Sequence, residues 1–491
     1  MPRKKGKHTR ADSRKRTYGR DSHTTRDLPS KCQGPSPSGQ CGHRRTPLLS
    51  CDWSHATHAS TLKSKAAVLA NNPVEQVGLP RGAVAPRRFN VRTFESLKVR
   101  GYRFYFFSSL AQMAAMNMQM VVNGWYVYKL TDSASLLGLT MLANAIPMLG
   151  LAFLGGVMAD RMPKRLLIGL GMVATSLLTL WIALSISAGI ITWHYLLVNS
   201  FLQAIVWALV MPSRQAIVPE LVGRDKLTNA IALQNTGMNF MQIGAPAIAG
   251  FMVAGVGIGG VYYLMAGLFL LAAALSLPLP KAVDNSSLRP PRRSVLGDIG
   301  DSLGYVRRNK PLLAVLTLSL FTVLFSMPFR MLLPVFTEDV LEVGPDKLGI
   351  LMSVSGVGAL VTSLAVASIR DKGRGMLFLH SGIVTGLSII AFSLTSSYWV
   401  AMAIIAVAGV GQAARMALGG ILVQSYTDSA HQGRVASLYL MQFGLTSLGT
   451  FGVSVAADFV GVQWAVGTTA SFLVLLTLFC YAFAPRIRRL D

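Results

Sequence analysis

Cysteine is scarce in this sequence, and its few copies are poorly spaced for cross-links or metal sites. Only 4 of the 491 residues are cysteines, and three of them (Cys32, Cys41 and Cys51) lie near the start, separated by eight and nine residues. Structural zinc sites bring their ligands in tight pairs such as Cys-x-x-Cys, and no such pair occurs. Cys480 stands alone in the last apolar run. We therefore expect no disulfide framework, no metal site and no cofactor.

Acidic residues and nucleotide motifs are missing where several kinds of protein need them. No Gly-x-x-x-x-Gly-Lys-Ser/Thr segment occurs, so the chain is not expected to hydrolyse ATP by itself. No Asp or Glu falls in the middle of an apolar run between residues 104 and 484, whereas a cation exporter normally needs a membrane carboxylate. No His, Asp or Cys cluster recurs at ligand or triad spacing inside those runs. We expect no catalytic residues and no enzymatic activity.

Long apolar runs are abundant instead. Hydrophobic residues make up 52% of the chain and charged residues 14%. A helix needs roughly 20 apolar residues to cross a bilayer. Apolar blocks bounded by turn signals predict an all-α integral membrane protein with 12 transmembrane helices in two pseudo-symmetric six-helix bundles. The predicted spans are 104–128, 135–159, 166–188, 191–213, 229–254, 258–279, 311–336, 346–370, 376–395, 397–423, 435–457 and 462–484.

The loops between these spans separate by charge. One set is cationic and includes residues 160–165, 280–310 and 485–489, whereas the other set is short and neutral or acidic, as at 337–347. Cationic loops remain in the cytoplasm. The sequence therefore predicts a multi-pass protein of the inner (plasma) membrane with both termini in the cytoplasm.

Four regions follow from this division. The first 103 residues hold 22 Lys or Arg against 6 Asp or Glu and few large aliphatic residues, so residues 1–95 are predicted to be a disordered basic cytoplasmic tail, with no nucleic-acid partner expected. Residues 96–280 form an N-terminal six-helix bundle, 281–310 a cytoplasmic linker, and 311–491 a C-terminal six-helix bundle. Two related halves suit a protein that rocks one half against the other around a central site.

The most specific motif is the basic turn between the second and third spans. It reads Gly-x-x-x-Asp-Arg-x-x-Lys-Arg from Gly156 to Arg165, and four charges in six residues cannot lie in hydrocarbon. The motif resembles the loop between helices 2 and 3 of the major facilitator superfamily of transporters, with Pro163 where that family usually has Gly. The resemblance covers roughly residues 95–485.

Three further segments resemble the enterobactin-exporter-like branch of this superfamily. Residues 212–222, followed by Asn229 and Ala230, look like the loop between helices 4 and 5 of that branch. The segments 328–336 in helix 7 and 128–133 after helix 1 support the same branch.

The resemblance implies a cytoplasmic latch between the two halves. In the superfamily, a carboxylate and a guanidinium at this seam clamp the outward-open state, and Asp160 and Arg434 stand at the matching positions. We expect Asp160–Arg434 to be the main latch. The other residues of the turn expected to contribute are Gly156, Arg161, Lys164 and Arg165, and Asp371 paired with Arg224 or Lys226 is expected to be a weaker counterpart of the latch. The alternative interpretation is that these charges only cap helix ends and fix topology.

Helix 5 carries a partial signature of export. Exporters of the superfamily often have Gly-Pro-x-x-Gly-Gly there, because Pro kinks the helix and Gly lets neighbouring helices approach closely. This chain has Gly244, Pro246 and Gly250 within Gly-Ala-Pro-Ala-Ile-Ala-Gly. The match favours export, and an ordinary kinked helix is the alternative.

Candidate residues of the substrate cavity are the polar and aromatic side chains inside the spans, namely Asn117, Asn123, Trp207, Arg330 and Arg415. Ionisable groups within a span are costly and usually functional. Two arginines without an acid predict an anionic or neutral amphipathic cargo. The alternative is that Arg330 snorkels towards the acids that follow it and that Arg415 pairs with a carbonyl.

The resulting hypothesis is a monomeric secondary transporter that works by alternating access. Its partners are the lipid bilayer and a small molecule, such as a siderophore or drug, that it exports. The family resemblance implies the proton as coupling ion. An importer of a small solute, and a membrane sensor or scaffold that does not transport, are the alternatives.

Overall fold

The computed structural model describes residues 94–280, 303–368, 373–428, 431–483 and 488. All regular structure in these ranges is helical. The predicted basic tail lies outside them except for its last two residues, and so does the predicted linker except for its final eight.

The helix boundaries follow the apolar runs of the sequence closely. The helices are η1 (Glu95–Lys98), α2 (Arg100–Thr131), α3 (Ala134–Arg161), α4 (Lys164–Ser187), α5 (Trp193–Ser276), α7 (Lys310–Met331), α8 (Leu333–Asp339), α9 (Pro345–Ser368), α10 (Arg374–Ser393), α11 (Tyr398–Ser425), α12 (Gln432–Val460) and α13 (Val462–Phe483).

Helix α5 is three helices joined without loops. Its 84 residues are interrupted only at Gly223 (φ 70°, ψ 172°) and Gly257 (φ 80°, ψ 170°). A side chain would clash with the backbone in that conformation, so glycine allows the chain to reverse within one residue. We call residues 193–222, 224–256 and 258–276 the first, second and third segments of α5.

The described residues thus contain twelve long helical segments, as the sequence predicted. By length and composition alone, eight helices within the described ranges are apolar enough to cross a membrane. One of them, Asp225–Ser276, holds the second and third segments of α5. The all-helical membrane fold is confirmed.

Two predicted boundaries are wrong, and a third turn is shorter than expected. Residues 214–228 were expected to form a loop because they carry charges, yet they are helical apart from Gly223. Arg214 is only 4% exposed, because its Nη2 donates a hydrogen bond to Ser109 Oγ (2.8 Å) and its guanidinium lies over the ring of Tyr105. The expected loop at 255–258 is the single residue Gly257. The seventh span ends at Met331, since a break at Leu332 separates α7 from α8.

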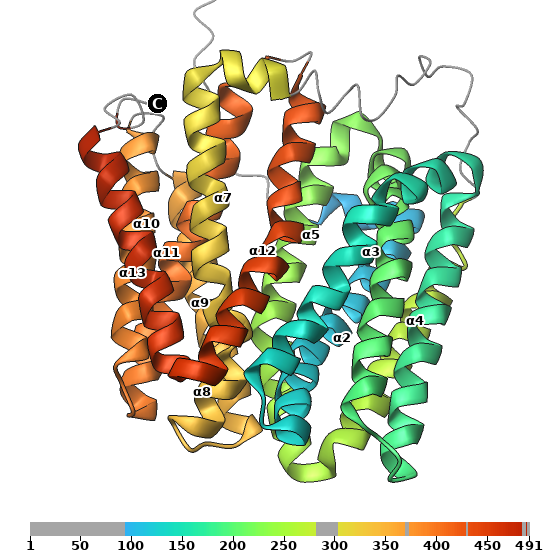
Figure 1. Ribbon diagram of the computed structural model, residues 1–491. Coiled ribbons are helices and arrows are strands. Elements are labelled where there is room, and N and C mark those ends of the chain that lie inside the picture. Colours follow the sequence, from blue (N-terminus) through green and yellow to red (C-terminus); the bar gives the residue numbers. More distant parts are fainter. Residues whose placement is uncertain (1–93, 281–302, 369–372, 429–430, 484–487, 489–491) are drawn as a thin grey trace, which may run out of the picture. The chain divides into compact units, whose positions relative to one another are not determined.

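The helices gather in two groups, and their ends define two faces (Figure 1). We call α2 to α5 the N-terminal half and α7 to α13 the C-terminal half. The face at the bottom of Figure 1, with α8 and the α2–α3 turn, is called the lower face; the opposite face, with the α3–α4 turn, is the upper face.

Candidate functional site

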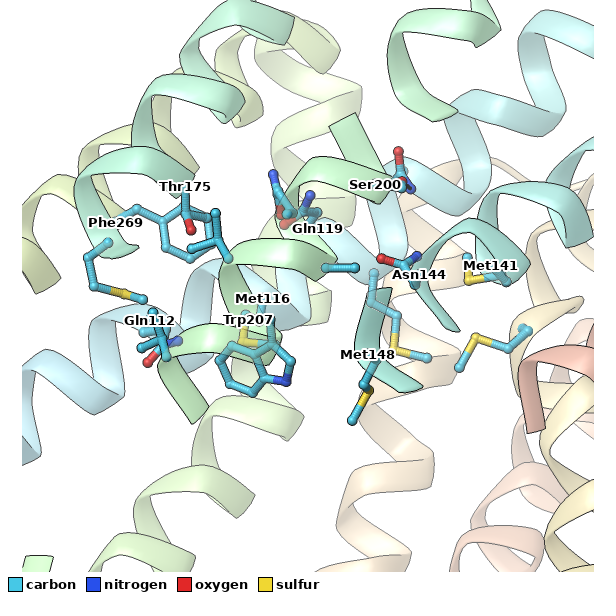
Figure 2. Close-up of a pocket in the computed structure, with 18 residues that line it drawn as sticks. Gln112, Met116, Gln119, Met141, Asn144, Met148, Thr175, Ser200, Trp207 and Phe269 are labelled. Atoms are coloured by element: carbon cyan, nitrogen blue, oxygen red, sulfur yellow. Dashed lines mark hydrogen bonds between the residues drawn. The ribbon is translucent and has the colours of Figure 1, made fainter. Parts of the chain in front are cut away.

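A pocket of about 250 Å³ lies mostly within the N-terminal half. Of its 18 lining residues, all but Met331 of α7 come from α2, α3, α4 and the first and third segments of α5 (Figure 2). The lining contains six thioethers: Met116, Met120, Met141, Met148, Met172 and Met331. It also contains five amides: Gln112, Gln119, Asn123, Asn144 and Gln203. None of the lining residues carries an ionisable group.

Helical periodicity brings these side chains together. Residues three and four apart share one face of a helix. On α2, Gln112, Met116, Met120 and Asn123 follow this spacing and all line the pocket. The first segment of α5 repeats the pattern with Ser200, Gln203, Ala204 and Trp207.

Several pocket amides have partners on neighbouring helices. Asn123 Nδ2 donates a hydrogen bond to Ser200 Oγ (3.4 Å), and the Tyr262 hydroxyl donates to Asn123 Oδ1 (3.4 Å). Gln203 Nε2 donates to Thr179 Oγ1 (3.3 Å). These contacts hold neutral polar groups in place around the cavity before any ligand arrives.

The predicted cavity residues divide between this pocket and other places. Asn123 and Trp207 line it, whereas Asn117, Arg330 and Arg415 do not. Asn117 Nδ2 donates to the carbonyl of Met113 in its own helix (2.8 Å).

The two intramembrane arginines lie in the C-terminal half. Arg330 of α7 reaches Gln242 in the second segment of α5; with the Gln242 amide oxygen turned towards the guanidinium, Nη1 and Nη2 lie at 3.0 and 3.1 Å from it. Arg415 of α11 is 1% exposed, and its Nε and Nη1 have no hydrogen-bond partner among the described residues.

Polar contacts join the two halves at the lower face. Trp125 Nε1 donates to Glu338 Oε2 (3.2 Å), and Lys129 Nζ forms an ion pair with Glu338 Oε1 (2.7 Å). The Tyr128 hydroxyl lies 2.7 and 2.6 Å from the two carboxylate oxygens of Asp339. The last turns of α2 are therefore bound to α8 of the other half. Burial raises the pKa of the Asp339 carboxyl above its usual range, although the Tyr128 hydrogen bond opposes this.

A second polar contact at this face joins α12 to the start of α3. Asp458 accepts hydrogen bonds from the backbone N–H of Ala134 (2.7 Å) and of Ser135 (3.0 Å), and from Ser133 Oγ (2.9 Å). The first N–H groups of a helix have no partner within the helix and carry its positive end. Asp458 thus caps a helix of the opposite half.

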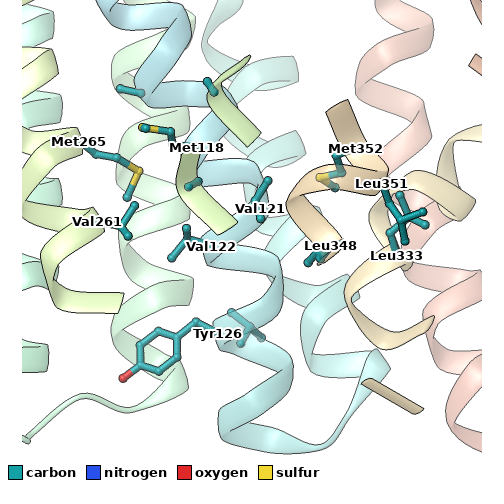
Figure 3. Close-up of a cluster of buried hydrophobic side chains, with 14 of the residues drawn as sticks. Met118, Val121, Val122, Tyr126, Val261, Met265, Leu333, Leu348, Leu351 and Met352 are labelled. Carbon is teal, nitrogen blue, oxygen red and sulfur yellow. The ribbon is translucent and has the colours of Figure 1, made fainter. Parts of the chain in front are cut away.

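Apolar packing continues this closure into the protein. Figure 3 shows Val121 and Val122 of α2 between Val261 of α5 and Leu348 of α9, all within one buried cluster.

The second segment of α5 also approaches α9 closely. A Cβ on Gly250 would overlap the carbonyl of Pro345, and a Cβ on Gly349 would overlap the carbonyl of Pro246. Among the three predicted helix-5 residues, Gly250 and Pro246 therefore contact the other half, and a Cβ on Gly244 would meet open space. The backbone stays helical through Pro246.

The predicted latch lies largely beyond what the structure describes. Asp371 is outside the described residues, and so are the side chains of Asp160 and Arg434; the backbone of Gly156 lies in α3.

The remaining residues of the motif make contacts within the N-terminal half or are exposed. Lys164 pairs with Glu220 of α5. Arg165 Nη1 donates to the carbonyl of Leu279 (3.2 Å). Arg161 is exposed.

Two features of the site were missed in the sequence. The methionines of the pocket could have been found from their spacing with the amides on α2. Asp458 had no local signal, because its partners lie 323 to 325 positions away along the chain.

Comparison with known proteins gives a consistent match. A model of a family described as transmembrane secretion effectors, within the major facilitator superfamily, matches residues 91–490. The staphyloferrin A transporter of Staphylococcus aureus is 24% identical over 392 residues, covering 78% of this chain and 96% of that protein. Macrolide efflux protein A of Streptococcus pyogenes is 20% identical, with 81% and 99% covered. The enterobactin exporter EntS of Shigella boydii is 24% identical, with 70% and 81% covered.

Solved structures share the fold. The nucleoside transporter NupG superimposes with a TM-score of 0.61 at 14% identity, covering 78% of this chain and 98% of that one. A bacterial homolog of the human lysosomal transporter Spinster, in an inward-facing and unoccupied conformation, gives a TM-score of 0.62 at 14% identity, with 82% and 98% covered.

Proposed function

The chain belongs to the transmembrane secretion effector family of the major facilitator superfamily, and on this premise we propose that it exports a small amphipathic compound, such as a siderophore or drug, by alternating access. It is a multi-pass membrane transporter and not an enzyme. Export is supported by relatives named as a macrolide efflux protein and an enterobactin exporter. The partial export signature of helix 5 points the same way.

The observation that carries the proposal is the closure of one face by contacts between the halves. Residues of α2 and α3 bind α8 and α12 there, while the pocket lies deeper between the helices. A pocket that opens to both faces in turn requires these contacts to break and re-form. Polar contacts of modest strength suit that task better than an uninterrupted apolar seam.

Charge supports one orientation of the two faces. The lower face carries acids such as Asp132, Glu338 and Asp458, whereas the upper face carries Arg161 and Arg165. Cationic segments remain in the cytoplasm. We therefore place the upper face and both termini in the cytoplasm of the cell, and the closed lower face outside the plasma membrane.

The upper face would then hold the latch. In the proposed cycle, Asp160 and Arg434 attract each other when the lower face opens, and Asp371 forms a weaker second pair with Arg224 or Lys226. The attraction is effective because the pair approaches only while that seam is closed and partly shielded from water. Arg330 and Arg415 would favour an anionic group on the cargo when the halves part. The transporter acts as a monomer, and the proton is the coupling ion.

Transport in membrane vesicles of defined orientation tests the proposal. Everted vesicles from a host lacking its own exporters would be given a pH gradient and a panel of labelled siderophores and macrolides. We expect accumulation inside everted vesicles that stops when a protonophore collapses the gradient. Vesicles from the same host without this chain are the control. Accumulation only in right-side-out vesicles would show that the protein imports its substrate. Accumulation unaffected by the protonophore would refute the proton as the coupling ion.

A further inference from the structure

One side chain of the pocket is buried with an unused hydrogen-bond acceptor. Gln112 of α2 is 1% exposed, lines the pocket, and its Oε1 has no hydrogen-bond partner in the described part of the chain. Most buried polar atoms in proteins have a partner, because an unpaired one loses its water without compensation. The Oε1 atom itself is buried, and a rotation of the Gln112 amide would turn this acceptor into the cavity that the residue lines, where a donor arriving with a ligand would pair with it.

The surroundings of Gln112 define what else this ligand must be. Figure 2 shows Gln112 and Phe269 at one end of the pocket, Asn144 and Met148 at the other, and Trp207 between them. An elongated occupant that fills the pocket from end to end therefore lies beside the indole ring of Trp207. Methionine side chains are flexible and polarizable, so they pack against apolar bodies of varied shape.

Electrostatics limits the charge of the part that enters. All 18 lining residues are uncharged at neutral pH. A charged group moved into such a lining would lose its hydration without gaining a counter-ion.

We propose that Gln112 is a specificity-determining residue that accepts a hydrogen bond from an N–H or O–H group on the uncharged, apolar-bodied end of the cargo. The methionines and Trp207 hold the body, and Gln112 selects the donor at its tip. This inference rests on the proposed transport function, since it names the chemistry that the same pocket admits. It leaves an anionic group, where the cargo has one, outside this pocket.

The test compares three dansyl probes binding to the purified full-length chain in phosphatidylcholine nanodiscs, followed by dansyl fluorescence. Dansylamide is uncharged and has a sulfonamide N–H donor; N,N-dimethyldansylamide is uncharged and has no donor; dansylglycine is an anion. We expect the wild-type protein to bind dansylamide about 3- to 10-fold more tightly than the dimethyl probe, the usual effect of one net hydrogen bond. We expect dansylglycine to bind more weakly than dansylamide.

Two variants assign the preference to one residue. Gln112→Met keeps the length of the side chain, removes the acceptor, and should make the two uncharged probes bind equally. Gln424→Met, the same substitution at an exposed glutamine of α11 outside the pocket lining, should keep the wild-type ratio. A ratio that persists in Gln112→Met, or equal binding of all three probes by the wild-type protein, overturns the inference.

The wild-type comparison needs no mutation, so it stands even if Gln112→Met fails to fold. Failure of any probe to bind the wild-type protein also overturns the inference. The binding measurement needs no membrane gradient and has no direction. If dansylamide binds more tightly than the dimethyl probe but vesicles show no transport, the proposed export function is refuted. If vesicles show gradient-driven transport but the two probes bind equally, only the role of Gln112 is refuted.

Discussion

Replacing Asp458 by Asn should shift the protein away from the state with a closed lower face. The carboxylate accepts three hydrogen bonds from the start of α3, two of them from backbone N–H groups at the positive end of the helix. Asparagine keeps one acceptor oxygen but loses the charge and the second acceptor. A charge at a helix N-terminus contributes about 0.3–1 kcal/mol when exposed, and a hydrogen bond to a charged group about 1.5–3 kcal/mol.

The exposure of Asp458 reduces these figures. Its side chain is open to solvent, so screening brings the expected loss down to about 1 kcal/mol. That free energy corresponds to a change of about fivefold in the ratio of closed to open lower faces, since 1.4 kcal/mol is about tenfold. Ser133 Oγ would still accept a hydrogen bond from the N–H of Leu136, so α3 keeps a cap of its own and should remain folded.

Distances between spin labels at the lower face would measure this shift. Ile190, beyond the end of α4, and Val460, in the last turn of α12, are exposed and lie on opposite halves, so cysteines placed there can be labelled after the native cysteines are replaced. The Asp458→Asn protein should show a larger share of long distances than the parent.

Glu342→Gln is the matched control. It removes one charge from an exposed acid of the same face and should leave the distances unchanged. Identical distance distributions in the parent and in Asp458→Asn would refute the view that this cap between the halves stabilises closure.

Three further results are expected. Asp160→Asn should slow transport in vesicles several-fold when the variant is present in the membrane at the wild-type level. Transport at the full rate would refute the proposed latch. Because burial raises the pKa of Asp339, the closed lower face binds a proton more readily than an open, hydrated one. Lowering the pH from about 7 towards about 4 should therefore favour short distances between the spin labels. Asp339→Asn should make those distances less dependent on pH. Gly349→Val should push α9 away from Pro246 and destabilise the closed state by about 1–3 kcal/mol. Gly267→Val, where a Cβ meets open space, should leave label distances unchanged.

The helices of this protein could be predicted well because the bilayer imposes a simple rule on sequence. Every backbone polar group in hydrocarbon must be satisfied within its own helix, so apolar length marks each span. The rule fails where a charged side chain within a helix finds its partners on neighbouring helices. Arg214 suggested a loop, yet its guanidinium lies against Tyr105 and Ser109 inside the N-terminal half.

The candidate site was only partly predictable for a related reason. Asn123 and Trp207 were recognisable as polar and aromatic residues within apolar spans, and both line the pocket. Arg330 and Arg415 are also polar residues within apolar spans, but they do not line the pocket. Whether such a residue reaches the pocket depends on which face of its helix packs against a neighbouring helix. The contacts of Asp458 depend on the packing of helices from different halves, and nothing local in the sequence encodes that packing.

The lopsided lining of the pocket has a thermodynamic consequence. Seventeen of its 18 residues belong to the N-terminal half. A cargo bound there would keep nearly all of its contacts while the C-terminal half moves relative to the N-terminal half. Its surroundings would then be nearly the same whichever compartment it faces. A ligand biases a conformational equilibrium only by the difference in its affinity for the two states. Binding of cargo held in this way would favour neither state, so the free energy for net pumping would have to come from the coupling ion acting on the contacts between the halves.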